Sequence, residues 1–117
     1  MITLYGIPNC DTIKKARNWM NQHSINYQFH DFKKDGLDKT KLTEWIDQQG
    51  WETIINKRST TWRQLDDATK NSMDSVNAIA VALENPSIIK RPVLEINNIC
   101  MATGFKPDNY LTLLCQK

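Results

Sequence analysis

A strand, a helix and a second strand follow one another within residues 2–32, and this order restricts the fold more than any other feature of the sequence. The apolar run Ile2–Tyr5, which ends at Gly6, predicts a strand. Apolar residues spaced three and four apart predict a helix over Thr12–Gln22, and alternating apolar and polar residues predict a strand over Ile25–Phe32. This arrangement indicates a βαβ unit with parallel strands and a right-handed crossover.

The C-terminal part of the chain carries a complementary pattern. Val93–Ile96 and Ile99–Thr103 predict two strands, and Asn97-Asn98 between them tolerates the positive φ of a tight hairpin turn. Pro107 suits the first turn of a last helix. The residues expected on its inner face are Tyr110, Leu111 and Leu114. A βαβ unit followed by a ββα unit is the thioredoxin topology, an α/β fold with a mixed four-stranded sheet.

Residues 37–86 predict helices only, so we expect an all-helical insertion in a single domain that covers residues 1–117. The expected helix starts are Asp38 as an N-cap, a capping box at Thr61–Gln64 ahead of a second helix, and Asp74-Ser75 ahead of a third. The first helix is expected to run to Gln49 and stop at Gly50, and the third to end before Pro86. The four tryptophans are expected in core or half-buried positions.

Composition excludes several classes of protein. Lys and Arg number 15 against 13 Asp and Glu, and the basic residues form no run longer than a pair, which argues against nucleic-acid binding. No apolar run approaches the roughly 20 residues of a membrane span, and no signal peptide precedes the first predicted strand. We therefore expect a cytoplasmic protein, monomeric by default, with no membrane partner.

The cysteines and histidines predict neither a disulfide framework nor a metal site. Cys10, Cys100 and Cys115 are an odd number of thiols at wide spacing. His23 and His30 show no metal-ligand spacing with them. We expect no bound metal or cofactor.

Cys10 lies where the first strand gives way to the first helix, and it is the candidate nucleophile. The amides and the dipole at a helix N-terminus favour negative charge, and such a position can lower a cysteine pKa from about 8.5 to roughly 3.5–7.5. Asn9 and Thr12 can donate to its sulfur, whereas a carboxylate at Asp11 acts in the opposite direction. The alternative is a small apolar residue that packs under a loop.

The predicted topology brings Arg91-Pro92-Val93 close to Cys10. A cis proline at this position would expose the adjoining backbone to a peptide-like ligand; the alternative is a trans proline that only begins a strand. Arg58 and Arg91 are candidate anion clamps that would also stabilise a thiolate, or else solvated surface residues. Lys106 could join this clamp as a third, weaker member.

The predicted site lacks a second thiol. Ile13 stands where a Cys-x-x-Cys motif would place its second cysteine, and Cys100 and Cys115 are expected to be buried. A thioredoxin-like site with one cysteine needs an external thiol to complete its cycle, and glutathione is the thiol at hand in the cytosol.

A set of motifs along the chain resembles a known family. They are Leu4–Ile7, Asn9–Arg17, Phe29–Asp31, Gly36–Asp38, Thr60–Asp66, Ile88–Pro92 and Gly104-Phe105. Together they resemble the arsenate reductase-like (ArsC/Spx) family, which also contains the Spx-type transcription regulators, and most closely its YffB-type branch. The resemblance implies a thioredoxin fold with a helical insertion and Cys10 as nucleophile. It also places the oxyanion arginines at Arg58 and Arg91.

The resemblance also suggests the reaction. Arsenate reductases carry Cys-Gly-Thr-Ser-Arg where this chain has Cys10–Lys14, and an arginine where it has Lys106. These departures favour the glutathione-dependent thiol reductase activity ascribed to the nearer branch. We therefore predict a thiol–disulfide oxidoreductase that acts on a small-molecule or protein disulfide. The alternatives are an arsenate reductase coupled to glutathione and glutaredoxin, or a non-catalytic regulator that binds RNA polymerase.

Overall fold

The protein is described by a computed structural model that covers residues 1–115. The chain forms two compact units, one built from Met1–Gly36 and the segment from Arg91 onward, the other from Leu37–Lys90. We call them the sheet unit and the helical unit. In the described residues, no helix is long and apolar enough to cross a membrane.

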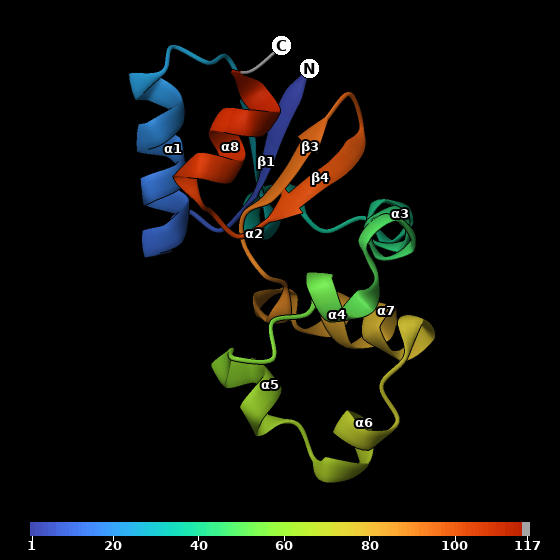
Figure 1. The fold of residues 1–117 in the computed structure, drawn as a ribbon. Helices are drawn as coiled ribbons and strands as arrows, with labels where there is room; N and C mark the ends of the chain where they lie inside the picture. The colour runs from blue at the N-terminus through green and yellow to red at the C-terminus, as the bar shows by residue number, and fades with distance from the viewer. Residues whose placement is uncertain (116–117) are drawn as a thin grey trace. The chain divides into compact units, whose positions relative to one another are not determined.

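The sheet unit has the predicted thioredoxin topology (Figure 1). Its strands are β1 (Ile2–Gly6), β2 (Gln28–Asp31), β3 (Val93–Ile96) and β4 (Ile99–Thr103), and its helices are α1 (Asp11–Gln22), α2 (Phe32–Asp35) and α8 (Pro107–Leu114). The strand order is β2-β1-β3-β4. β1 runs parallel to β2 and antiparallel to β3, which is itself antiparallel to β4. The predicted mixed four-stranded sheet is thereby confirmed.

The core of this unit lies between one face of the sheet and the helices α1 and α8, which cover that face in Figure 1. Its buried residues are Leu4, Ala16, Trp19, Met20, Leu94, Ala102 and Tyr110. The rings of Trp19 and Tyr110 meet edge to face with centroids 5.7 Å apart, so aromatic packing joins the two helices. The apolar residues of α1 recur every three or four positions, so they form one side of the helix, and that side is buried against the sheet.

Three details of the predicted sheet unit are resolved by the structure. The hairpin turn is confirmed, since Asn97 and Asn98 have φ of 53° and 68°. β2 is shorter than predicted at both ends: residues 25–27 precede it and Phe32 begins α2, although Ile25 and Tyr27 still pack against the core. Leu111 does not face inward but is 39% exposed, while Leu113 and Leu114 pack on the core. Positions three and four beyond the buried Tyr110 share its helix face, and position 111 does not.

The helical unit consists of short helices. They are α3 (Lys39–Gln49), α4 (Trp51–Ile54), α5 (Thr60–Gln64), α6 (Asp67–Asn71), α7 (Ser75–Glu84) and the 3-10 helix η1 (Pro86–Ile88). An isolated antiparallel bridge joins Ile55 to Ile89. The buried apolar residues of this unit are Leu42, Trp45, Ile46, Ile54, Ile55, Ala78, Ala82, Ile88 and Ile89. The patterns predicted α3 and α7, but not the one-turn helices α4 and α6, which are too short for a clear period.

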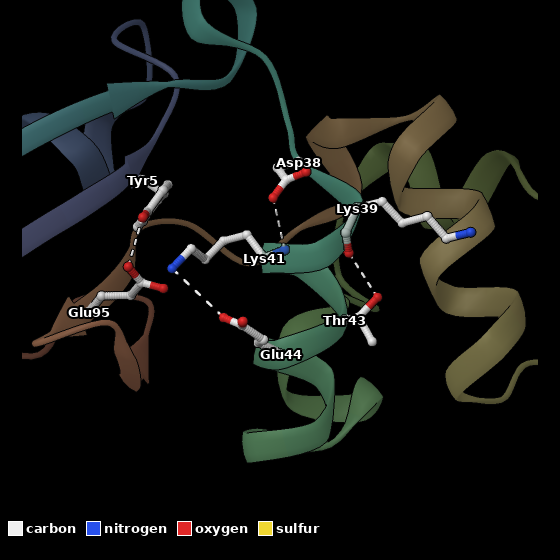
Figure 2. Close-up of polar contacts among 7 residues, drawn as sticks. All are labelled: Tyr5, Asp38, Lys39, Lys41, Thr43, Glu44 and Glu95. Carbon is white, nitrogen blue, oxygen red and sulfur yellow. Dashed lines mark hydrogen bonds and ion pairs between the residues drawn. The ribbon is translucent and has the colours of Figure 1, made fainter.

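Side-chain caps begin most of these helices. Asp38 accepts a hydrogen bond from the Lys41 amide at 3.3 Å, as Figure 2 shows, and Asp74 accepts one from the Asn77 amide at 2.8 Å. Both predicted N-caps are confirmed. The capping box at Thr61–Gln64 is wrong: Ser59 is the N-cap, its hydroxyl accepts from the Trp62 amide at 3.0 Å, and the four predicted residues lie inside α5. The serine two residues earlier supplies the cap oxygen, so the helix starts sooner.

Candidate active site at Cys10

Four connections of the sheet unit meet at one end of the sheet. Gly6, the last residue of β1, pairs with Asp31 at the end of β2. Tyr5 pairs with Val93 at the start of β3, and Val93 pairs with Thr103 at the end of β4. The loop to α1, the start of α2, the Arg91-Pro92 segment and the turn to α8 therefore lie at the same end. Both longer helices of the unit begin there, each with the positive end of its dipole.

Cys10 is the N-cap residue of α1 and is partly exposed. Its backbone is extended, with φ of −126° and ψ of 127°, and its carbonyl accepts from the Lys14 amide at 3.0 Å. No side chain caps α1. In the part of the chain that the structure describes, neither Asn9 nor Thr12 makes a hydrogen bond to the sulfur; Thr12 lies in the first turn of the helix. The predicted helix start is thus confirmed, one residue earlier than Thr12.

Gly6 and Ile13 fix the approach of α1 to the sheet. Ile13 is fully buried, and a Cβ added to Gly6 would clash with its Cδ1 and lie 3.1 Å from its Cγ1. The same Cβ would lie 3.9 Å from Arg91 Cβ. A glycine is therefore required where β1 ends, because α1 and Arg91 both approach its backbone closely. The position of a second redox cysteine is filled by a core residue.

Arg91-Pro92 adopts the cis form. The Pro92 carbonyl accepts a hydrogen bond from the Gly104 amide at 2.9 Å, and Pro92 and Val93 are buried. Arg91 is partly exposed next to Gly6. The predicted proximity of this segment to the end of β1 is therefore observed. Lys106 is the exposed N-cap residue of α8 at the same end of the sheet, and no side chain caps that helix either.

Arg58 belongs to the helical unit. It lies between α4 and α5, is exposed, and its amide donates to Asn56 Oδ1 at 3.0 Å. Its role as an anion clamp for Cys10 stays a prediction.

The other two cysteines differ from each other. Cys100 on β4 is buried as expected, and burial, with a further contribution from the charge of Glu95, raises the pKa of its thiol to about 11. Cys115 is not buried: it is the exposed residue that follows α8.

The sheet unit also contains one buried carboxylate that the sequence did not single out. Glu95 on β3 is 1% exposed, and it accepts a hydrogen bond from the Tyr5 hydroxyl at 2.7 Å, shown in Figure 2. A buried carboxylate needs such partners to offset its lost hydration. The signal in the sequence was its place in the apolar strand Val93–Ile96, where a glutamate is unexpected.

A second residue missed from the sequence is Arg17 on α1. Its guanidinium lies 4.4 Å from the centroid of the Phe29 ring, and its Nε donates to the Tyr27 hydroxyl at 3.0 Å. The available signal was its spacing of seven residues from Cys10, two helical turns along the same side of α1.

The described fold and site define a class: a thioredoxin-like protein with one partly exposed cysteine at the start of its first helix and a buried isoleucine three residues later. The chain belongs to the ArsC family, whose model matches residues 5–113.

Relatives in sequence agree with this assignment. An uncharacterized protein of Haemophilus influenzae is 53% identical over 94 residues, which are 80% of this chain and 82% of that protein. The global transcriptional regulator Spx of Streptococcus mutans is 32% identical over 117 aligned residues, covering 97% of this chain and 83% of the regulator.

Solved structures show the same fold. The YffB protein is 46% identical with a TM-score of 0.92, over 98% of this chain and all of that chain (100%). An arsenate reductase-related protein from Brucella melitensis is 43% identical with a TM-score of 0.79, covering 98% of this chain and 95% of the other. An arsenate reductase from Vibrio cholerae, at 17% identity and a TM-score of 0.80 over 97% of each chain, shares the fold.

Proposed function

We propose that this protein is a glutathione-dependent thiol–disulfide oxidoreductase with Cys10 as its nucleophile. The observation that carries the proposal is the placement of Cys10: it is a partly exposed N-cap residue at the start of a 12-residue helix whose first-turn amides have no side-chain cap. Open amides at a helix N-terminus are donors for an anionic group that binds there. The ArsC family membership and the arsenate reductase-related neighbour support redox chemistry at this cysteine.

The proposed reaction has two steps. The Cys10 thiolate attacks a mixed disulfide between glutathione and a small molecule or protein; the substrate leaves as a thiolate, and a Cys10–glutathione disulfide forms. A second glutathione thiolate then attacks the glutathione sulfur of this intermediate, which releases oxidised glutathione and regenerates the Cys10 thiolate. Buried Ile13 supports this external resolution, because no thiol lies at position 13.

The groups around Cys10 have proposed roles in binding. Arg91 and Lys106, at the same end of the sheet, would hold the anionic end of the substrate or of glutathione, with Arg58 of the helical unit as a third cation. The backbone at Pro92 and Val93 would pair with the peptide part of glutathione. Asn9 and Thr12 would contact the bound sulfur. The reaction needs no metal or other cofactor, and we place it in the cytoplasm.

Turnover of hydroxyethyl disulfide with reduced glutathione, coupled to glutathione reductase and NADPH, tests this function. We expect Cys10→Ser to abolish turnover, whereas Cys115→Ser keeps it within twofold. Turnover by Cys10→Ser at the parent rate would refute the proposal. Perturbation of amide NMR shifts near residues 10 and 91–93 by glutathione is the expected binding signature.

The relatives favour two alternatives. The Spx relative supports the alternative of a regulator that binds RNA polymerase. In that role this chain would have Cys10 at the start of a helix but no Cys-x-x-Cys pair. Retention of polymerase in a pull-down by both the parent and Cys10→Ser, with no disulfide turnover, would favour this role. The Brucella melitensis neighbour supports arsenate reduction. Arsenate turnover with glutathione and glutaredoxin as donors would identify it.

A further inference from the structure

Arg17 lies on the same side of α1 as Cys10, and two contacts hold its guanidinium in place without an acidic partner in residues 1–115. The ring of Phe29 lies under it at 4.4 Å, and its Nε is bonded to the Tyr27 hydroxyl at 3.0 Å. Within residues 1–115, no carboxylate pairs with this arginine, and its two terminal nitrogens make no hydrogen bond. The side chain is only partly exposed. Two contacts therefore hold the guanidinium in place and leave the N–H groups of its two terminal nitrogens for a ligand.

The helix geometry places Arg17 on the same side of α1 as Cys10. Residues 10, 14 and 17 are four and three apart, so they form one stripe along α1, and Arg17 lies about 10 Å from Cys10 along the axis. Side chains of a helix as a rule lean toward its N-terminus, which for α1 is the end that carries Cys10. Lys14 is the exposed middle member of the stripe.

The neighbouring acidic groups do not neutralise Arg17. Asp11 is exposed at the start of α1, about 100° around the helix from the stripe. Asp31 lies two residues after Phe29, but its Oδ1 accepts from the amides of Lys33 at 2.9 Å and Lys34 at 3.4 Å as the cap of α2. The stripe from Cys10 to Arg17 thus carries two basic side chains, Lys14 and Arg17, and no carboxylate.

We propose that Arg17 is a specificity-determining residue that binds a carboxylate of the thiol or disulfide reacting at Cys10. This inference rests on the proposed function of Cys10. A planar guanidinium binds carboxylates in two-point fashion, and one that is already held by other contacts loses little entropy on binding. An extended peptide spans about 3.3–3.6 Å per residue, so the carboxylate lies one to three residues from the reacting sulfur. Glutathione and an acidic protein segment both supply such a group.

The test is the rate at which Cys10 forms a mixed disulfide, followed at this residue by mass spectrometry. In the reaction, the Cys10 thiolate forms the new S–S bond and the other half of the disulfide leaves as a thiolate. The probes are oxidised glutathione, neutral hydroxyethyl disulfide, and two peptide disulfides with Glu or Gln two residues from the cysteine. The variants are Arg17→Gln, Arg17→Lys and Tyr27→Phe, with Lys15→Gln as a matched charge control on another side of α1.

We expect Arg17→Gln to lower the rate at which Cys10 reacts with oxidised glutathione or with the Glu peptide about tenfold. The rate with hydroxyethyl disulfide should fall by less than twofold. Arg17→Lys, which keeps the charge but loses the fork, and Tyr27→Phe, which frees the fork, fall between the parent and Arg17→Gln. A loss with oxidised glutathione only identifies the small molecule as the source of the carboxylate; a loss with the Glu peptide only identifies a protein segment.

Two results would overturn this role. An equal loss with charged and neutral disulfides would mean that Arg17 only supports the fold, and an equal loss in Lys15→Gln would mean a general effect of charge. In both cases Cys10 still reacts in the parent protein, so the proposed function survives. Failure of the parent Cys10 to react with any disulfide would instead refute the proposed function itself.

Discussion

Most helices of the helical unit begin with a side-chain cap, whereas the two longer helices of the sheet unit do not. The one-turn helices are exceptions: Asp31 caps α2 of the sheet unit, and α4 of the helical unit has no side-chain cap. In the helical unit, α3, α5, α6 and α7 each start at a residue whose side-chain oxygen accepts an amide hydrogen bond, from Asp38, Ser59, Asp66 and Asp74. In the sheet unit, the two longer helices start at Cys10 and Lys106 without a side-chain cap.

The difference relates the stability of the helical unit to the function proposed for Cys10. A side-chain cap satisfies amides that the helix itself cannot pair, and it contributes about 1 kcal/mol. The short helices of the helical unit have few backbone bonds of their own, so such caps matter most there. At α1 the amides stay open beside the Cys10 thiol, where the proposed reaction takes place. Of the two longer helices of the sheet unit that start without a side-chain cap, α1 is the one that carries the candidate nucleophile.

The thiols of the sheet unit give the sharpest test, since all three cysteines of the chain lie there. The pKa of Cys100 is raised from 9.0 to about 11, mainly by burial, so its thiolate at a given pH below 9 is about 100 times rarer than in an ordinary cysteine. We expect iodoacetamide to modify Cys100 at least 100-fold more slowly than a cysteine peptide at pH 8. Mass spectrometry after timed quenching measures the rates.

The sign of the pH dependence follows from the same shift. The neutral thiol is the form that the folded protein favours, so the rate at Cys100 rises about tenfold per pH unit until the pH approaches 11. In denaturant the difference between Cys100 and the peptide disappears. Fast modification of Cys100 in the folded protein at pH 8 would contradict its burial beside Glu95, while Cys115 is the exposed internal control.

A substitution at Gly6 tests how closely α1 packs against the end of β1. We expect Gly6→Ala to destabilise the protein by about 1–3 kcal/mol, because the new methyl group meets the buried Ile13 side chain. Urea unfolding measures the change. Ile13→Val removes the clashing Cδ1, so the double variant should recover part of the loss. Additive losses in the double variant would show that the two residues do not meet.

Asp74→Ala should cost the helical unit about 1 kcal/mol, since it removes the bond to the Asn77 amide at the start of α7. Thermal unfolding followed by circular dichroism measures the change. The matched control is Asp67→Ala: Asp67 is an exposed first-turn residue of α6, and Asp66, not Asp67, caps that helix. Equal costs for the two substitutions would argue that charge near a helix start, and not the cap bond, is responsible.

The smallest expected effect concerns stability at Cys10 itself. The extended backbone of this residue suits a capping side chain, so Cys10→Ser should be about 0.5–1 kcal/mol more stable than Cys10→Ala while both lack turnover. Urea unfolding of the two variants measures the difference. Equal stabilities would mean that the α1 amides cannot be capped from this position, and the contrast between the two units would then lose its physical basis.

Local patterns in the sequence predicted much of this structure. The spacing of apolar residues predicted α1 and α7, and the start and stop residues Asp38 and Gly50 predicted α3. Asp38 and Asp74 marked two helix starts because capping depends only on the neighbouring amides. The same local chemistry also caused an error, since Thr61–Gln64 matches a capping box although Ser59 is the cap. Position 10 at a strand-to-helix junction likewise pointed to a thiol at a helix start.

Long-range packing supplied what these patterns could not. Three features depend on residues distant in the sequence. They are the burial of Cys100 near Glu95, the exposure of Cys115, and the contacts of Arg17 with Phe29 and Tyr27. The same holds for Arg91, whose Cβ lies beside the end of β1 only because β3 pairs with that strand.

The sequence by itself determined the order of strands and helices and the thiol at a helix start, because periodicity and capping act within a few residues. The tertiary structure alone decided that Cys115 is exposed, that Glu95 is a buried carboxylate, and that the Arg17 guanidinium is held without a carboxylate among residues 1–115. Burial and electrostatics depend on what packs around a group, and that is fixed only when distant segments come together.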